Sequence, residues 1–219
     1  MRLDQSSFKS IKEFINEFKK RFTRLDILMN NAGGVFSEFE LTEDGNEMTI
    51  QVNTFAPMLL SEGLLDILHK SDGKIVNIGS KSHTKQALSK DDYLKMIDIN
   101  WDFNKSNYGA YKQYCISKVG PVMFNQYLCE FIRQNRLDVD TYCLHPGTVR
   151  TDIVRNPKHK IIMYLLYPLI WLVTKSLEKG CQTALYLCYE DKEKLKSGEY
   201  YQDCALKSVA SHCDWKNLS

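Results

Sequence analysis

A chain of 219 residues that is 43% hydrophobic and 26% charged has the composition of one globular domain with a single core. Its formal net charge is only +2 and its lysines are scattered among acidic residues, so we expect no nucleic-acid partner. Its seven cysteines are an odd number without a C-x-x-C pair, which predicts reduced thiols, a cytoplasmic location and no metal site.

Apolar segments typical of helices and strands alternate along the chain. Apolar residues recur at helical spacing from Phe8 to Phe22, and Ser6 or Ser7 is placed to cap that helix. The later predicted elements are, in order, a strand at 25–30, a helix at about 47–68, a strand at 74–80, a helix at about 111–133, a strand at 139–147, a helix at about 177–189 and a strand at 198–203. Because parallel strands need long crossover connections, this order predicts one α/β domain over 1–219 with a parallel sheet covered by helices.

Two segments stand apart from this alternation. Residues 82–108 are polar and charged, and we expect a surface insertion with one or two helical turns. Residues 161–173, IIMYLLYPLIWLV, are too few to span a bilayer and are interrupted by Pro168. Two interpretations stay open for them: a helix of the core or of a lid over a ligand cleft, and a peripheral contact with a membrane surface.

Small and polar residues follow three of the predicted strands, where open parallel sheets bind their ligands. They are Asn30, Asn31, Ala32 and Gly33 after the first strand, Gly79 and Ser80 after the second, and His145, Pro146, Gly147 and Thr148 after the third. Such residues let a ligand approach the backbone, but they also form ordinary turns. Each strand end taken alone is therefore ambiguous.

Tyr114 and Lys118 lie four residues apart in GAYKQYCISKVG, so a helix places both side chains on one face. An ammonium about 4 Å from a phenolate stabilises it by roughly 4 kcal/mol at an effective dielectric constant of about 20. This energy can lower the tyrosine pKa by at most about three units from its ordinary value of about 10. Such a tyrosine could exchange protons with an alcohol near neutral pH. Taken alone, the spacing fits a solvated helix better.

Four motifs in a fixed order resemble those of the short-chain dehydrogenase/reductase family: NNAG at 30–33, VNIGS ending in Ser80, YCISK at 114–118 and HPGTVRT at 145–151. The segments LTEDG at 41–45 and SGEYYQDC at 197–204, and the histidine before Pro146, are similar to its retinol-dehydrogenase-like branch. The resemblance implies a Rossmann-like sheet with helices on both faces. It also implies hydride transfer between NADP or NAD and a small-molecule alcohol or carbonyl, with lipophilic, retinoid-like or aldehyde-like compounds as candidates.

The resemblance implies a role for each matching residue. Tyr114 would be the general acid/base, Lys118 would lower its pKa and hold the nicotinamide ribose, and Ser80 would hydrogen-bond the substrate carbonyl. Asn53 would support a proton relay through the lysine. The implied cofactor-binding residues are Asp4, Asn30, Ala32, Gly33, Tyr114, Lys118, Pro146, Gly147, Val149 and Thr151.

This sequence also departs from the family pattern. The family opens with a strand, a T-G-x-x-x-G-x-G turn and a helix that receives the pyrophosphate, followed by two further strands, whereas the only adjacent glycines here are Gly33 and Gly34. Gly79 stands where relatives carry a second serine. We therefore expect an N-terminally truncated sheet with an open edge at 25–30 and weak dinucleotide binding.

Two functions stay open at this point. The first is an oxidoreductase whose missing start lies upstream of Met1. The second is a catalytically inert relative that acts through the open sheet edge as a binding or dimerising module. A homodimer is compatible with both.

Overall fold

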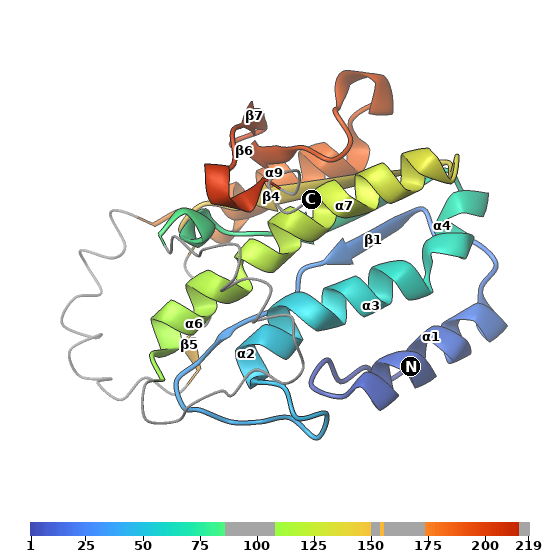
Figure 1. Cartoon of the computed structure of the whole chain (residues 1–219). Helices are drawn as coiled ribbons and strands as arrows, with labels where there is room; N and C mark the ends of the chain where they lie inside the picture. The colour runs from blue at the N-terminus through green and yellow to red at the C-terminus, as the bar shows by residue number, and fades with distance from the viewer. Residues whose placement is uncertain (86–107, 150–153, 156–173, 215–219) are drawn as a thin grey trace.

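The computed structural model describes residues 1–85, 108–149, 154–155 and 174–214. Its centre is a five-stranded sheet with the order β1-β3-β4-β6-β7 (Figure 1). The strands are β1 Ile27–Asn30, β3 Gly73–Ile78, β4 Val139–His145, β6 Tyr200–Gln202 and β7 Ala205–Lys207. The first four pair in parallel and β7 pairs antiparallel to β6. The predicted α/β class with a parallel sheet is confirmed.

Helices cover both faces of the sheet, as predicted. The helices α1 Phe8–Arg21, α3 Ala56–Gly63, α4 Leu65–Lys70 and α7 Val119–Gln134 pack on one face, and α9 Leu177–Tyr189 packs on the other (Figure 1). Successive residues of a strand point to opposite faces. Ile75 of β3 therefore joins the core under α1, α3 and α7, while Val76 joins the core under α9.

The start of α1 is fixed by Ser7, one of the two predicted caps. The Ser7 hydroxyl accepts a hydrogen bond from the backbone N–H of Ser10 at 3.2 Å, which satisfies one of the unpaired amides of the first turn. Ile11 and Ile15 are the buried residues of the helix. Ile15 packs so tightly on α3 that a Cβ at Gly63 would lie 2.4 Å from its Cδ1. The apolar face of α1, which the amphipathic pattern predicts, thus packs against α3.

The two long predicted helices are interrupted. The segment predicted as a helix at 47–68 forms α2 Met48–Ile50, the π-helix η1 Gln51–Phe55, and then α3 and α4. The segment predicted at 111–133 forms α6 Ala110–Ser117 and α7, with Lys118 at the junction in a conformation (φ −89°, ψ −5°) outside regular helix. Periodicity does not register such changes of helix type or one-residue breaks, because the apolar face continues through them.

The structure adds pairings that the sequence does not predict. The strand predicted at 198–203 is the first half of a hairpin, β6 and β7, whose turn residues Asp203 and Cys204 both have positive φ. A two-residue turn of this kind usually contains glycine, so its sequence signal is missing here. A second sheet pairs β2 Val35–Phe36 with β5 Val154–Arg155 in parallel.

The predicted segment 161–173 and most of 82–108 lie outside the described residues. Among the residues the structure does describe, no helix has the length and apolar character to cross a membrane.

The strand β1 stands at one end of the sheet and pairs only with β3 among the described strands. This position matches the open edge expected for 25–30. Met29 of β1 keeps 38% of its surface exposed. On the same face, which α9 covers, the Lys74 ammonium of β3 donates to the carbonyls of Leu187, Cys188 and Glu190 at 2.6–3.2 Å and so satisfies the end of α9.

Close packing of α7 against η1 can be tested at Gly120. A Cβ at Gly120 would lie 2.2 Å from Thr54 Cγ2. We expect Gly120→Ala to lower the free energy of unfolding by about 1–3 kcal/mol, because overpacking must push η1 away from α7. Urea denaturation measures this change. Gly109→Ala is the matched control, since its Cβ would meet Lys112 Cβ at an ordinary 3.6 Å, and equal losses in the two variants would contradict the proposed packing.

Candidate active site

The predicted site residues collect where β1, β3 and β4 end. Asn30 closes β1 and is buried, and its amide donates to Ser61 Oγ at 2.9 Å and to Asn77 Oδ1 at 2.8 Å. This side chain therefore ties β1 to β3 and α3. Ala32 and Gly33 follow on the surface, where their backbone is exposed to solvent.

Asn53 of the π-helix η1 holds the loop after β1. Its Oδ1 accepts from the N–H of Gly34 and its Nδ2 donates to the carbonyl of Gly34, both at 2.9 Å. The same Nδ2 donates to Ser117 Oγ at 2.9 Å. A Cβ at Gly33 would lie 2.7 Å from Asn53 Oδ1 and 3.5 Å from Lys118 Nζ. The structure thus brings Gly33, Asn53 and Lys118 together, and only glycine leaves the space between them free.

Tyr114 and Ser80 form the second group. Tyr114 of α6 is buried with 8% of its surface exposed, and the buried Ser80 hydroxyl donates to Ser82 Oγ and accepts from the Ser82 N–H, both at 3.1 Å. Burial raises the pKa of Tyr114, and the Ser80 side chain opposes that rise only in part. The phenol is therefore neutral at physiological pH.

Lys118 lies in the same pocket. Only 5% of its surface is exposed, and its Nζ donates to the carbonyl of Ile78, the last residue of β3, at 3.0 Å. The Nζ lies 5.9 Å from the centre of the Tyr114 ring. Burial lowers the pKa of Lys118 to about 8.

The sequence predicts that Lys118 lowers the pKa of Tyr114, whereas the largest influence on that pKa in the structure is burial, which raises it. The Lys118 ammonium is directed at the Ile78 carbonyl, and the dominant influence on Tyr114 is its own burial, which raises the pKa of the phenol. The sequence argument assumed about 4 Å between the two charged atoms and ignored the cost of placing a phenolate in a buried site.

The loop after β4 is shaped by the segment before α9. Gly147 has a φ of 89°, a conformation that glycine adopts without strain, and Lys175 covers it so closely that a Cβ there would lie 2.8 Å from Lys175 Cδ. The N–H of Lys175 donates to the Thr148 carbonyl at 2.7 Å, and Val149 packs against Gly180. Pro146, Gly147 and Val149 thus form a braced loop at the end of β4, and Thr151 lies outside the described residues.

Asp4 occupies the turn before α1. Its Oδ1 accepts from the N–H and the hydroxyl of Ser6 at 2.9 and 2.6 Å, and these hydrogen bonds lower the pKa of Asp4. The carboxylate therefore organises its own turn.

Sequence reasoning missed Gly34, Ser117 and Ile78, whose backbone or hydroxyl groups hold Asn53 and Lys118. A hydrogen bond to a backbone atom does not depend on the type of residue, so the sequence alone does not reveal it.

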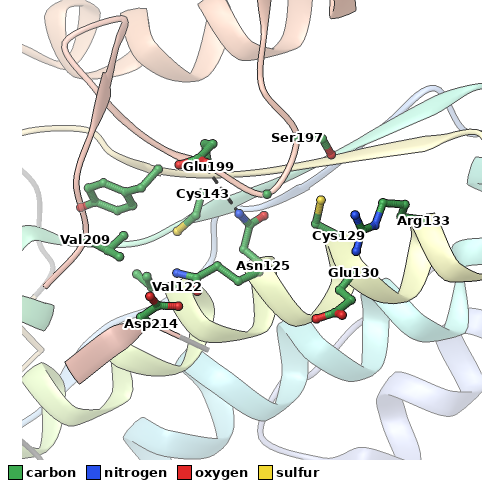
Figure 2. A pocket seen from close by; sticks show the side chains of 13 residues that line it. Val122, Asn125, Cys129, Glu130, Arg133, Cys143, Ser197, Glu199, Val209 and Asp214 are labelled. Carbon is green, nitrogen blue, oxygen red and sulfur yellow. Dashed lines mark hydrogen bonds between the residues drawn. The ribbon is translucent and has the colours of Figure 1, made fainter. Parts of the chain in front are cut away.

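A separate pocket of about 540 Å³ opens between α7 and the chain leading into β6 (Figure 2). Asn125, Cys129 and Glu199 are among its lining residues, and none of the predicted site residues is. The amide of Asn125 accepts from Thr141 Oγ1 at 2.7 Å and donates to the Glu199 carbonyl at 3.4 Å. Tyr114 and Ser80 do not line this pocket, and its buried amide is already paired.

Comparison with known proteins supports the resemblance. The family described as short chain dehydrogenase matches residues 1–94. Retinol dehydrogenase 13 of mouse is 34% identical over 217 residues, which are 97% of this chain and 62% of the relative. The chain therefore spans less than two thirds of the length of that relative.

Solved structures share the fold. A protein from Mycobacterium paratuberculosis aligns with a TM-score of 0.70 at 19% identity, over 100% of this chain and 70% of that one. NADPH-bound carbonyl reductase from chicken fatty liver aligns with a TM-score of 0.61 at 22% identity, over 91% of this chain and 72% of that one. These comparisons support a place for the chain in the short-chain dehydrogenase/reductase family. Within it, its sequence relatives are of the retinol-dehydrogenase-like branch.

The buried ammonium of Lys118 predicts a specific dependence of stability on pH. Its pKa falls from 10.5 in the unfolded chain to about 8 in the fold, so between these values the unfolded state binds a proton that the folded state does not. The free energy of unfolding of the wild type should therefore decrease as pH falls through this window. The decrease should exceed that of Lys118→Met by about 3 kcal/mol.

Urea unfolding at about pH 7 and at pH 10.5 measures this difference. Lys112→Met is the matched control, because Lys112 is exposed on the neighbouring helix α6. If Lys118→Met and wild type show the same pH dependence, the Lys118 ammonium is solvated and the described geometry is wrong.

Proposed function

We propose that this chain carries the catalytic part of an oxidoreductase that moves hydride between NADP or NAD and an alcohol or carbonyl substrate. The observation that carries the proposal is the burial of Tyr114, Ser80 and Lys118 near the end of β3, with the Lys118 ammonium on the Ile78 carbonyl and 5.9 Å from the centre of the Tyr114 ring. The buried hydroxyls of Tyr114 and Ser80 suit the recognition of a carbonyl oxygen, and the Lys118 ammonium beside the solvent-facing Gly33 suits the recognition of an adjoining ribose.

The roles follow from the protonation states. Burial keeps Tyr114 neutral, so its hydroxyl is ready to donate a proton to a carbonyl oxygen, and the Ser80 hydroxyl supplies a second hydrogen bond to that oxygen. Lys118, whose pKa is about 8, can exchange a proton near neutral pH, and Asn53 keeps the adjoining loop in place. The nicotinamide cofactor supplies or accepts the hydride when bound.

The residues fit the nicotinamide half of such a cofactor better than its pyrophosphate. The space in front of Gly33 is bounded by Asn53 and Lys118, and the positive φ of Gly147 opens the loop after β4. The 219 residues contain no glycine-rich phosphate turn. We assign the nicotinamide side to Gly33, Lys118, Pro146, Gly147, Val149 and Thr151, and leave Asp4, Asn30 and Ala32 for the adenosine side.

The substrate we propose is lipophilic, because the chain resembles a protein named retinol dehydrogenase over 97% of its length. A lid or membrane-surface contact formed by 161–173 would deliver such a substrate, and belongs to the same proposal. We place the reaction in the cytoplasm, since all seven cysteines are free thiols. Neither the proposed substrate nor the proposed location requires a homodimer. Light scattering measures whether one forms.

A second candidate function is an inert binding or dimerising module. It is favoured by β1, which ends the sheet with Met29 exposed. Titration of the 219-residue chain with reduced dinucleotide separates the two candidates. Saturable binding with turnover of a medium-chain aldehyde supports the oxidoreductase, whereas a folded chain without either supports the module.

Tyr114→Phe tests the catalytic assignment. Removing the hydroxyl should lower turnover by about 10²- to 10⁴-fold, because the proton donor is lost, while the dissociation constant of the dinucleotide stays the same. Reduced-dinucleotide absorbance follows turnover and fluorescence follows binding. Tyr111→Phe is the matched control, since Tyr111 lies on the same helix with 61% of its surface exposed. Turnover retained in Tyr114→Phe would remove Tyr114 from its role.

A further inference from the structure

His83 lies three residues beyond Ser80, in the short 3-10 helix η2 Lys81–Thr84, and is 1% exposed. Its Nδ1 lies 2.6 Å from the backbone carbonyl oxygen of Ser80. A carbonyl oxygen can only accept a hydrogen bond, so Nδ1 must carry the proton. The imidazole therefore donates to the residue proposed to bind the substrate oxygen.

The surroundings of His83 keep this tautomer in place. Its ring packs edge-on against the ring of Tyr200, with the centres 5.0 Å apart, and its own carbonyl accepts from His212 Nε2 at 3.0 Å. The His83 Nε2 is buried and has no hydrogen-bond partner among the described residues. A second proton on that atom would be buried without an acceptor, and burial accordingly lowers the pKa of His83. The ring is neutral, with one proton on Nδ1.

Ser80 needs such support because the residue before it has no side chain. At Gly79 a Cβ would lie 2.8 Å from Cys143 Sγ and 3.1 Å from the Leu144 carbonyl, so the neighbouring strand occupies the space that a side chain would need. Glycine leaves the backbone at the end of β3 free to rotate. The Ser80 carbonyl accepts a second, longer bond from the N–H of His83 at 3.2 Å. Two donors of His83 therefore hold the same carbonyl oxygen of Ser80.

We propose that His83 is a positioning residue that fixes the orientation of Ser80 toward Tyr114 through the contact between Nδ1 and the Ser80 carbonyl. The inference rests on the proposed oxidoreductase function for its effect on turnover. The contact itself is independent of that function.

Three variants separate positioning from packing. His83→Phe keeps a ring against Tyr200 and removes the donor, whereas His83→Asn keeps an N–H donor near the position of Nδ1. Tyr200→Phe is the matched control in the same cluster, because the Tyr200 hydroxyl is buried and has no hydrogen-bond partner among the described residues. We expect kcat to fall about 10- to 100-fold in His83→Phe with the dinucleotide affinity unchanged, to recover to within about threefold of wild type in His83→Asn, and to be unchanged in Tyr200→Phe. Equal losses in His83→Phe and His83→Asn would overturn the proposal.

A second measurement does not depend on turnover. Nitrogen-15 NMR of the imidazole should show His83 as the neutral tautomer with the proton on Nδ1, and His83→Phe should speed hydrogen exchange of the residue-83 amide by about tenfold or more, an effect absent from Tyr200→Phe. A proton on Nε2 alone, or unchanged exchange, would overturn the positioning contact. If wild type shows this tautomer and exchange pattern but no turnover, the contact stands and the proposed oxidoreductase function fails.

Discussion

The hydrogen bond from the Lys118 ammonium to the Ile78 carbonyl joins the two parts of the site that sequence places far apart. Ile78 ends β3 two residues before Ser80, and Lys118 follows directly after the helix that carries Tyr114. The bond spans 40 residues of chain, so it fixes the distance between the two hydroxyl-bearing elements. Asn53 adds the third element by pairing with both polar groups of the Gly34 backbone. Every proposed role depends on this arrangement.

Burial decides the electrostatics of the site. Near a protein surface, at an effective dielectric constant of about 20, an ammonium about 4 Å away would favour a phenolate by up to roughly 4 kcal/mol. Here both groups are buried, so burial raises the pKa of Tyr114 and lowers that of Lys118. The two pKa values move apart, with that of Lys118 below that of Tyr114, which makes the phenol a proton donor and the lysine a group that titrates near neutral pH. The site is therefore poised for acid chemistry on a carbonyl oxygen.

Hydrophobic periodicity and strand-end residues carried most of what the sequence could predict. The strands at 25–30, 74–80 and 139–147 and the helix from Phe8 to Phe22 depend on local pattern, and the structure has all of them. Periodicity could not reveal the break at Lys118, because the apolar face of the helix continues across it. The hairpin turn at Asp203 and Cys204 lacks the glycine that would have signalled it. Contacts with backbone atoms, such as His83 with the Ser80 carbonyl, depend on the fold and not on residue type.

The pKa of Lys118 is the most direct test of this account. A carbon-13 NMR titration of the Lys118 side chain should show a midpoint near 8, because the ammonium is buried against the Ile78 carbonyl. A midpoint at the ordinary lysine value of 10.5 would mean that water surrounds the ammonium. The helix bearing Tyr114 would then not be tied to the end of β3, and the described site would not exist.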